Sequence, residues 1–256
     1  MSEQKHVAIL TGATGGLGYA FLKEIIDEGY DEIWAIGRNE KRLNELTSEF
    51  GETVIPLPVN LTDAGEIAAL GEVLKERKPQ VDLLINNAGM AQMKYSSDLT
   101  REEIDATVDL NCKAPVVLTN ECLPYMRRGS KIINVCSAAA FQPTPYINLY
   151  ASTKAFARSY SRALNAELKP YGITVTAVCP SWIDTDMLTR DFNGQKIKFY
   201  GMVSPERVAK KAIKDANKGK DMSVCSTFVK FQHLNVKLMP QKLTMKIWMK
   251  YTKKYM

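Results

Sequence analysis

Tyr150 and Lys154 are the residues of this sequence whose types and spacing best suit acid–base chemistry. A spacing of four places both side chains on one face of a helix. An ammonium group beside a phenol stabilises the phenolate and lowers the pKa of the tyrosine. Such a tyrosine can exchange a proton with an alcohol or carbonyl oxygen, and Ser137, 13 residues earlier, could hydrogen-bond the same oxygen. The alternative is an ordinary helix surface.

The sequence offers few residues for a Ser-His-Asp triad or for a metal site. Any Ser-His-Asp triad or multi-histidine metal site would have to be built from His6 and His233, the two histidines. The five cysteines contain no CxxC pair, so we expect no zinc and assign no metal ligand. An odd cysteine count without a secretion signal fits a reducing cytosol, and we therefore expect a cytoplasmic protein.

The first apolar run ends in a glycine-rich segment, TGATGGLG at 11–18. Its glycines give a tight turn with little side-chain bulk, so backbone N–H groups and the start of the next helix can approach a phosphate. We predict that this segment binds a dinucleotide through Gly12, Thr14, Gly16, Leu17 and Gly18. A tight turn without a ligand is the competing interpretation.

The second apolar run ends at Arg38. In dinucleotide-binding folds an acidic residue at this point binds the ribose 2′-hydroxyl, whereas an arginine accommodates a 2′-phosphate. The sequence has no acidic residue there, which favours NADP(H) and leaves NAD(H) as the alternative. The fourth run ends in NNAG at 86–89, where the small residues Asn87 and Ala88 suit a ligand lying across the strand ends.

The elements that must position these residues alternate along the chain. Apolar runs at 6–10, 32–36, 53–57, 82–86, 131–136, 173–179 and 222–226 alternate with helical stretches at 16–28, 39–49, 63–77, 101–127, 149–169 and 205–217. Runs without polar alternation predict strands buried on both faces. The pattern predicts a single α/β domain with a doubly wound, Rossmann-like parallel sheet. The polar segment 186–204 is predicted to be a lid or a loop.

Together these motifs resemble the classical short-chain dehydrogenase/reductase family over about residues 6–225. The resemblance is carried by TGATGGLG at 11–18, NNAG at 86–89, Asn111, Ser137 and Tyr150-x-x-x-Lys154. It implies that Tyr150 is the general acid/base and that Lys154 binds the nicotinamide ribose and lowers the tyrosine pKa. It further implies that Ser137 polarises the substrate carbonyl. Asn111 would kink its helix and hold the water of a proton relay.

The resemblance also implies cofactor contacts after the sixth strand. Thr185 would bind the nicotinamide carboxamide, and Pro180 and Ile183 belong to the same segment. Two positions depart from the family pattern. Pro180 is followed by Ser181 rather than the usual glycine, and Asn60 replaces the usual aspartate after the third strand. An asparagine can still hydrogen-bond the adenine.

The activity implied is that of an oxidoreductase transferring a hydride between NADP(H) and a small-molecule carbonyl or secondary alcohol. The alternatives are a dinucleotide-binding sensor, or a membrane- or partner-docking protein with little turnover. The substrate stays open. An acyl thioester on an acidic carrier would suit Arg127 and Arg128, unless these form a solvated helix end, and a lipophilic ketone or aldehyde would suit an apolar tail.

A broad apolar face on the 149–169 helix predicts a protein that assembles with copies of itself. The face is made of Phe156, Tyr160, Leu164 and Leu168. Family resemblance suggests that part of it pairs with a two-fold mate, together with the Asn111 helix, in a homodimer or homotetramer. The alternative is that the whole face packs inside one chain.

Basic charge gathers at the C-terminus. Residues 228–256 hold seven lysines and no acidic residue, which leaves a net charge of −1 for 1–227, so nucleic-acid binding is not indicated. We divide the chain into a dinucleotide-binding domain at 1–227 and an amphipathic helical tail at 228–256. After Pro240, one row holds Leu243, Ile247 and Tyr251 beside Trp248, and a second holds Lys242, Lys246, Lys250 and Lys254. This predicts a helix that either lies on a membrane surface or packs on its own protein.

Overall fold

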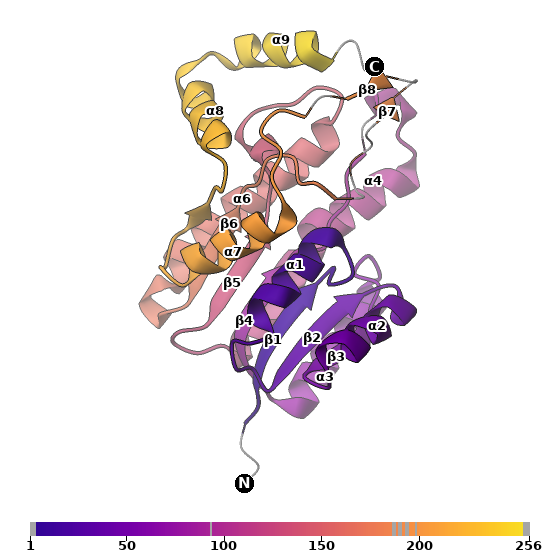
Figure 1. The fold of residues 1–256 in the computed structure, drawn as a ribbon, viewed down its shortest axis with the longest axis vertical. Helices are drawn as coiled ribbons and strands as arrows, with labels where there is room; N and C mark the ends of the chain where they lie inside the picture. Colours follow the sequence, from indigo (N-terminus) through magenta and orange to yellow (C-terminus); the bar gives the residue numbers. More distant parts are fainter. Residues whose placement is uncertain are drawn as a thin grey trace.

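A seven-stranded parallel sheet forms the centre of the molecule, which is a computed structural model describing residues 4–92, 94–185, 188, 191–192, 195–197 and 199–252. The strand order is β3-β2-β1-β4-β5-β6-β9 (Figure 1). The strands are β1 (His6–Thr11), β2 (Glu32–Gly37), β3 (Val54–Pro58), β4 (Gln80–Asn86), β5 (Lys131–Val135), β6 (Thr174–Val178) and β9 (Met222–Ser223). All seven predicted strands are present.

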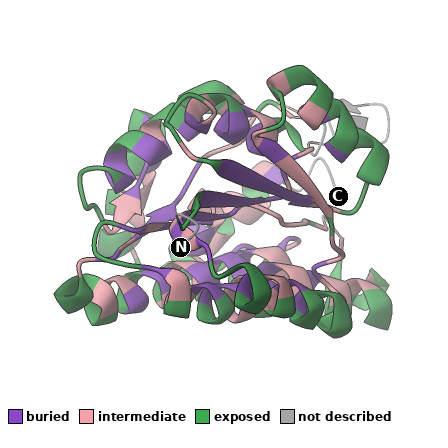
Figure 2. Ribbon diagram, turned by 90° about the horizontal axis from the view of Figure 1, so that it is seen from below, coloured by how far each residue is buried: buried purple, intermediate pink, exposed green. Residues whose placement is uncertain are grey.

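Helices cover both faces of the sheet (Figure 2). They are α1 (Gly16–Ile25), α2 (Glu40–Phe50), α3 (Ala64–Arg77), α4 (Arg101–Val108), α5 (Ala114–Cys122), α6 (Asn148–Leu168) and α7 (Pro205–Ala216). Alternate residues of β1 enter different cores. Ala8 and Leu10 pack under α1, α2 and α7, while Val7 and Ile9 pack under α3, α5 and α6. The doubly wound fold class predicted from the sequence is confirmed.

The sheet carries a buried polar ladder on the face that α5 and α6 cover. The Asn86 Nδ2 on β4 donates to the Asn134 Oδ1 on β5 at 2.8 Å, and the Asn134 Nδ2 donates to the Ser161 Oγ on α6 at 2.9 Å. The Ser161 hydroxyl then donates to the carbonyl of Ala157. Because these buried groups satisfy one another, the ladder ties two strands to one helix without an unpaired amide in the core.

The apolar face of α6 is mostly used within the chain. Leu164 is buried in the core under the sheet, and Tyr160 and Leu168 pack against it. Phe156 stays exposed, as do Ile104 and Val108 on the neighbouring α4. The apolar area of α6 left for a partner is therefore smaller than the sequence suggests.

Two segments differ from the sequence-based expectation. The stretch predicted as a lid or loop contains a short antiparallel hairpin, β7 (Asp191–Phe192) and β8 (Gln195–Lys196). The tail is helical as predicted, but it divides into two helices: α9 (Gln241–Thr252), which follows Pro240 as expected, and α8 (Thr227–Leu238), whose bounds the sequence pattern did not define. Lys254 lies outside the described residues.

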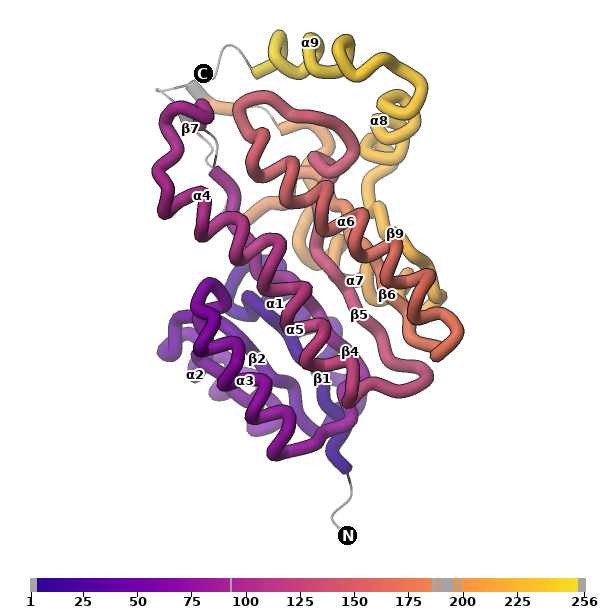
Figure 3. The backbone as a smooth tube through the Cα atoms, turned by 180° about the vertical axis from the view of Figure 1, so that it is seen from behind, coloured from indigo at the N-terminus to yellow at the C-terminus, as the bar shows by residue number. Residues whose placement is uncertain are grey.

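Helices α8 and α9 lie over the end of the sheet farthest from the N-terminus (Figure 3). On α8, the His233 ring stacks on Phe141 with centroids 3.9 Å apart. On α9, the Trp248 indole N–H donates to the carbonyl of Pro145 at 2.8 Å. The sequence grouped Trp248 with Leu243 and Ile247, but the structure turns Trp248 inward and leaves the other two exposed. Within the described part of the chain, no helix combines the length and apolar character needed to cross a membrane.

Candidate active site

The predicted site residues follow neighbouring strands that end at the same edge of the sheet. The glycine segment follows β1, NNAG continues β4, Ser137 follows β5 and Pro180 follows β6 (Figure 1). Because β1, β4, β5 and β6 are parallel and adjacent, their carboxyl ends lie side by side, which is where open α/β sheets bind their ligands. Helix α6 lies against this part of the sheet and brings two further side chains to it.

Ser137, Tyr150 and Lys154 come together at the end of β5. Lys154 is buried, and its Nζ donates to the carbonyl of Val135 at 2.8 Å. The same Nζ lies 5.8 Å from the centroid of the Tyr150 ring. The Tyr150 hydroxyl shares a hydrogen bond with the Ser137 side chain. The group therefore combines two hydroxyls and a fixed ammonium.

Burial governs the protonation of this group. It raises the pKa of Tyr150 above its ordinary value, and the hydrogen bond with Ser137 only partly opposes it. Burial likewise lowers the pKa of Lys154. In the chain by itself, desolvation of the phenolate outweighs the lowering contributions to the Tyr150 pKa, and the lowering by Lys154 that the family resemblance implies stays a prediction. Tyr150 consequently holds its proton at neutral pH and is ready to donate it.

Asn111 lies in a π-helical turn, Asp109–Lys113, that joins α4 to α5. Its Nδ2 donates to the carbonyl of Met90 at 2.9 Å and to the Thr153 hydroxyl at 3.0 Å, and its Oδ1 accepts from the Met90 N–H at 3.0 Å. Pro115 follows at the start of α5 and has no N–H to give to the Asn111 carbonyl. The break in the helix is thus local in origin, and it ties Asn111 to α6 beside Lys154.

Gly89 is a site residue that the sequence analysis quoted in NNAG without assigning it a role. A Cβ atom at this position would lie 3.2 Å from both the Asn111 Oδ1 and the Lys154 Nζ. Only a glycine leaves these two polar groups their present positions. The NNAG motif was the sequence signal for this residue. The reason that a glycine is required depends on the Asn111 and Lys154 side chains, which come from other elements of the fold.

The glycine segment forms a cradle that side chains would fill. Gly12 has a φ of +66°, and a Cβ on Gly18 would lie 2.0 Å from the Gly12 carbonyl oxygen. A Cβ on Gly16 would lie 2.8 Å from the Thr185 Cγ2, which brings the segment after β6 over the cradle. Helix α1 begins here without a side-chain cap or an acidic first turn, so its first N–H groups suit an anion. Leu17 is buried in the core and can offer only its backbone.

Asn87 and Ala88 hold the glycine segment in place. Their N–H groups both donate to the Thr11 hydroxyl, at 2.9 and 3.0 Å. The Asn87 Nδ2 also donates to the carbonyls of Thr11 and Gly12. Thr11 therefore belongs to the site, although within TGATGGLG the sequence indicated no role for it.

The far end of the cradle lies beside β2 and β3. Arg38 is exposed directly after β2. The Thr14 hydroxyl approaches the same strand end, 3.6 Å from where a Gly37 Cβ would stand. Asn60 uses its Oδ1 to accept from the N–H and hydroxyl of Thr62. Its Nδ2 is the group suited to donate to an adenine ring.

The segment after β6 runs beside Ser137. The Pro180 carbonyl accepts from the Ala138 N–H at 2.8 Å. The Thr185 N–H donates to the Ile183 carbonyl at 2.9 Å, and Ile183 pairs with Val203 in an isolated bridge. Ser181 lacks a positive φ, so it replaces the usual glycine without backbone strain.

Arg127 and Arg128 lie at the opposite end of the sheet, before β5 begins. Arg127 donates to the Gln4 side chain at 2.8 Å, and Arg128 to the Pro170 carbonyl. The structure therefore does not support a role for these arginines in holding an acidic carrier near Ser137.

Comparison with known proteins agrees with this geometry. The sequence profile of the family described as short chain dehydrogenase matches residues 6–196. A probable NADP-dependent dehydrogenase of Haemophilus influenzae is 35% identical over 208 residues, which cover 79% of this chain and 78% of that protein. An uncharacterized oxidoreductase of Staphylococcus epidermidis is 30% identical over 196 residues, covering 75% of this chain and 85% of the relative. A short-chain dehydrogenase from Sphingobium yanoikuyae, solved in complex with NADPH, has a TM-score of 0.77 at 27% identity, covering 94% of this chain and 95% of the other.

Proposed function

The chain belongs to the short-chain dehydrogenase/reductase family, and we propose that it is an NADP(H)-dependent oxidoreductase acting on a small-molecule carbonyl or secondary alcohol. The observation that carries this proposal is the meeting of Ser137, Tyr150 and the buried Lys154 beside the glycine cradle. A dinucleotide-binding sensor would have no use for such an acid–base group.

The residues of the cradle fit a dinucleotide. The glycines leave room for a pyrophosphate at the start of α1, Arg38 suits a 2′-phosphate, and Thr185 lies where a carboxamide could be held. Bound nicotinamide would supply or accept the hydride. The relative named as NADP-dependent and the neighbour solved with NADPH support NADP(H) over NAD(H).

The chain's own residues supply the proton and the electrostatic stabilisation. In reduction, negative charge develops on the substrate oxygen, and the hydroxyls of Tyr150 and Ser137 both donate toward it. Lys154 is held in position by the Val135 carbonyl, so its ammonium stays beside Tyr150 as the proton leaves. Asn111 positions this part of α6 through its bond to Thr153.

Tyr150→Phe tests the proposal because it removes the transferable proton and keeps the ring. We expect NADPH consumption with an active ketone to fall about 10² to 10⁴-fold, the range for losing general acid–base catalysis. NADPH affinity, measured by fluorescence titration, should change little. A parent protein that binds NADPH but consumes none across a broad ketone and aldehyde panel would instead support the sensor.

We also propose that the protein forms a homodimer or homotetramer through the exposed side of α4 and α6. Phe156, Ile104 and Val108 remain exposed there. Sedimentation at micromolar concentration tests the assembly, with Phe156→Ser expected to weaken it.

A further inference from the structure

The two C-terminal helices hold apolar side chains out toward solvent. On α8, Phe231 is 65% exposed and Leu238 is 75% exposed, with Leu234 between them. On α9, Leu243 and Ile247 are about half exposed. We call these five side chains and the lysines around them the cap face. Exposed apolar groups gathered in this way mark an interaction site more often than a solvated surface.

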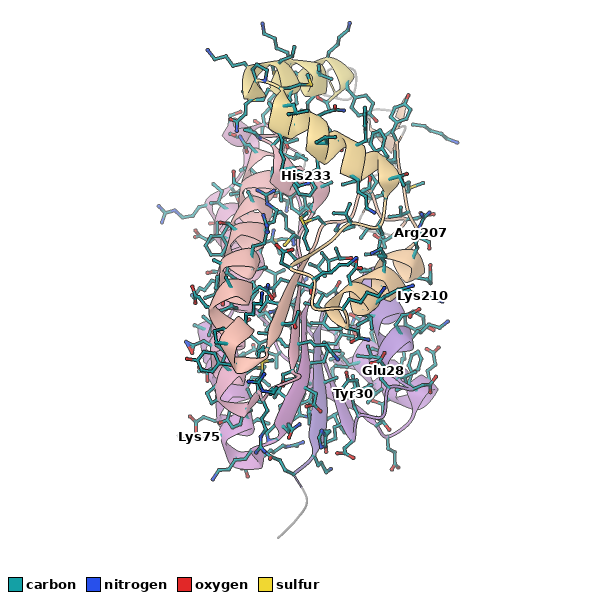
Figure 4. All side chains as sticks on the ribbon, turned by 90° about the vertical axis from the view of Figure 1, so that its left-hand side faces the viewer. Glu28, Tyr30, Lys75, Arg207, Lys210 and His233 are labelled. Atoms are coloured by element: carbon teal, nitrogen blue, oxygen red, sulfur yellow. The ribbon has the colours of Figure 1, made fainter. Side chains whose placement is uncertain are left out.

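The same helices carry unpaired positive charge. None of their described lysines forms an ion pair within the described residues, and all are exposed: Lys230, Lys237, Lys242, Lys246 and Lys250. The sequence has no acidic residue after Phe228 to neutralise them. In Figure 4, nitrogen-tipped side chains project from α9 away from the body of the protein.

The sides of α8 and α9 opposite the cap face pack against the body of the protein. His233 stacks on Phe141, Trp248 is bonded to Pro145, and Thr244 and Thr252 are buried. Figure 4 shows His233 on the side of α8 that faces the body. The inward sides of both helices therefore hold them against the protein while the cap face stays exposed. The exposed residues are not part of the core of the chain.

The positive charge and the apolar side chains of the cap face together indicate which partner it binds. A second copy docked by two-fold symmetry would bring equal rows of lysines against each other, which is unfavourable. An anionic lipid surface accepts both components, because its phosphates attract lysines and its acyl boundary accepts phenylalanine, leucine and isoleucine. We propose that the cap face docks on an anionic bilayer surface, with α8 and α9 lying in the interface.

Flotation of the full chain with phosphatidylcholine vesicles, with and without phosphatidylglycerol, tests this proposal. We expect binding only to the anionic vesicles, weakened by salt. Each lysine near the surface contributes about fivefold, so Lys242→Gln, Lys246→Gln and Lys250→Gln together should lower partitioning about 100-fold. Phe231→Ser should also weaken it, by about tenfold.

Matched variants elsewhere provide the controls. Lys210, Lys214 and Lys218 are exposed at the same spacing on and just after α7, and Figure 4 shows Lys210 on α7, outside the two C-terminal helices. Changing these three to glutamine removes the same charge and should leave binding nearly unchanged. Tyr171, 67% exposed, is the matched control for Phe231. Circular dichroism and urea midpoints establish that every variant is folded.

Three results would overturn the proposal. One is equal partitioning to neutral and anionic vesicles. Another is a loss of vesicle binding in the α7 lysine control that equals the loss in the Lys242, Lys246 and Lys250 variant, which would mean that the lysines act only through unspecific charge attraction. The third is an absence of vesicle binding with a parent dimer that Phe231→Ser converts to a monomer, which would assign the cap face to a second copy. None depends on the proposed hydride transfer.

Discussion

Gly89→Ala should slow turnover without removing any functional group. The added methyl would stand 3.2 Å from both the Asn111 Oδ1 and the Lys154 Nζ, which is tighter than nine in ten real contacts of a Cβ. One or both groups must therefore move by a few tenths of an ångström. A misplacement of 1 Å near reacting atoms costs about 10²-fold, so a shift of this size should lower kcat about four- to tenfold.

The assay is steady-state NADPH consumption with a saturating ketone, together with NADPH affinity. Gly65→Ala on α3 is the matched control. Its Cβ would also stand 3.2 Å from a polar side-chain atom, the Asp63 Oδ1, but it lies at the start of α3 and contacts neither Asn111 nor Lys154. We expect kcat to fall for Gly89→Ala alone. An unchanged kcat in a folded Gly89→Ala protein would refute the reasoning that Gly89 keeps Asn111 and Lys154 in place.

Three further predictions concern the cofactor, the core and pH. Arg38→Asp should abolish a tenfold to hundredfold preference for NADPH, roughly that of a charge-assisted hydrogen bond; equal kcat/KM for NADH and NADPH in the parent would contradict this. Asn134→Ala should lower the free energy of unfolding by about 2–3 kcal/mol, because it removes the two buried hydrogen bonds that Asn134 makes with Asn86 and Ser161; a urea midpoint matching the parent's would disprove it. Burial, with nearby cations, lowers the pKa of His233, so the unfolded chain takes up the proton first. Stability should fall as pH drops below about 6.5, and less so in His233→Gln; equal pH dependence by thermal melts would argue against it.

Much of the fold follows from the sequence because its causes are local. Runs such as 7–10 are apolar at every position, which suits only a strand covered on both faces. Parallel strands end at one edge, so the convergence of the glycine segment with Ser137 follows from the topology. Helical spacing alone predicts that Tyr150 and Lys154 lie on the same face of their helix.

What the sequence could not supply depends on distances between elements. The bounds of α8 within the predicted helical tail could not be defined, because Phe231 and Leu238 resemble core residues but face solvent, so the hydrophobic periodicity shows no consistent buried side. The role of Gly89 exists only because Asn111 and Lys154 reach it from two different helical segments. The direction of the Tyr150 pKa depends on how much water reaches its oxygen, which residue types do not disclose.

The polar ladder through Asn86, Asn134 and Ser161 has a consequence for strand alignment. Sliding β5 by one residue along β4 would turn Asn134 toward the other face of the sheet and put Ile133 or Val135 opposite Asn86. The Asn134 amide would then lose its bonds to Asn86 and Ser161, and a buried polar group left unsatisfied costs about 1–3 kcal/mol. An all-aliphatic pair of strands would lack that penalty. The ladder thus favours the observed register of β4 and β5, and this register sets the relative positions of Asn87 and Ser137 just beyond the two strands.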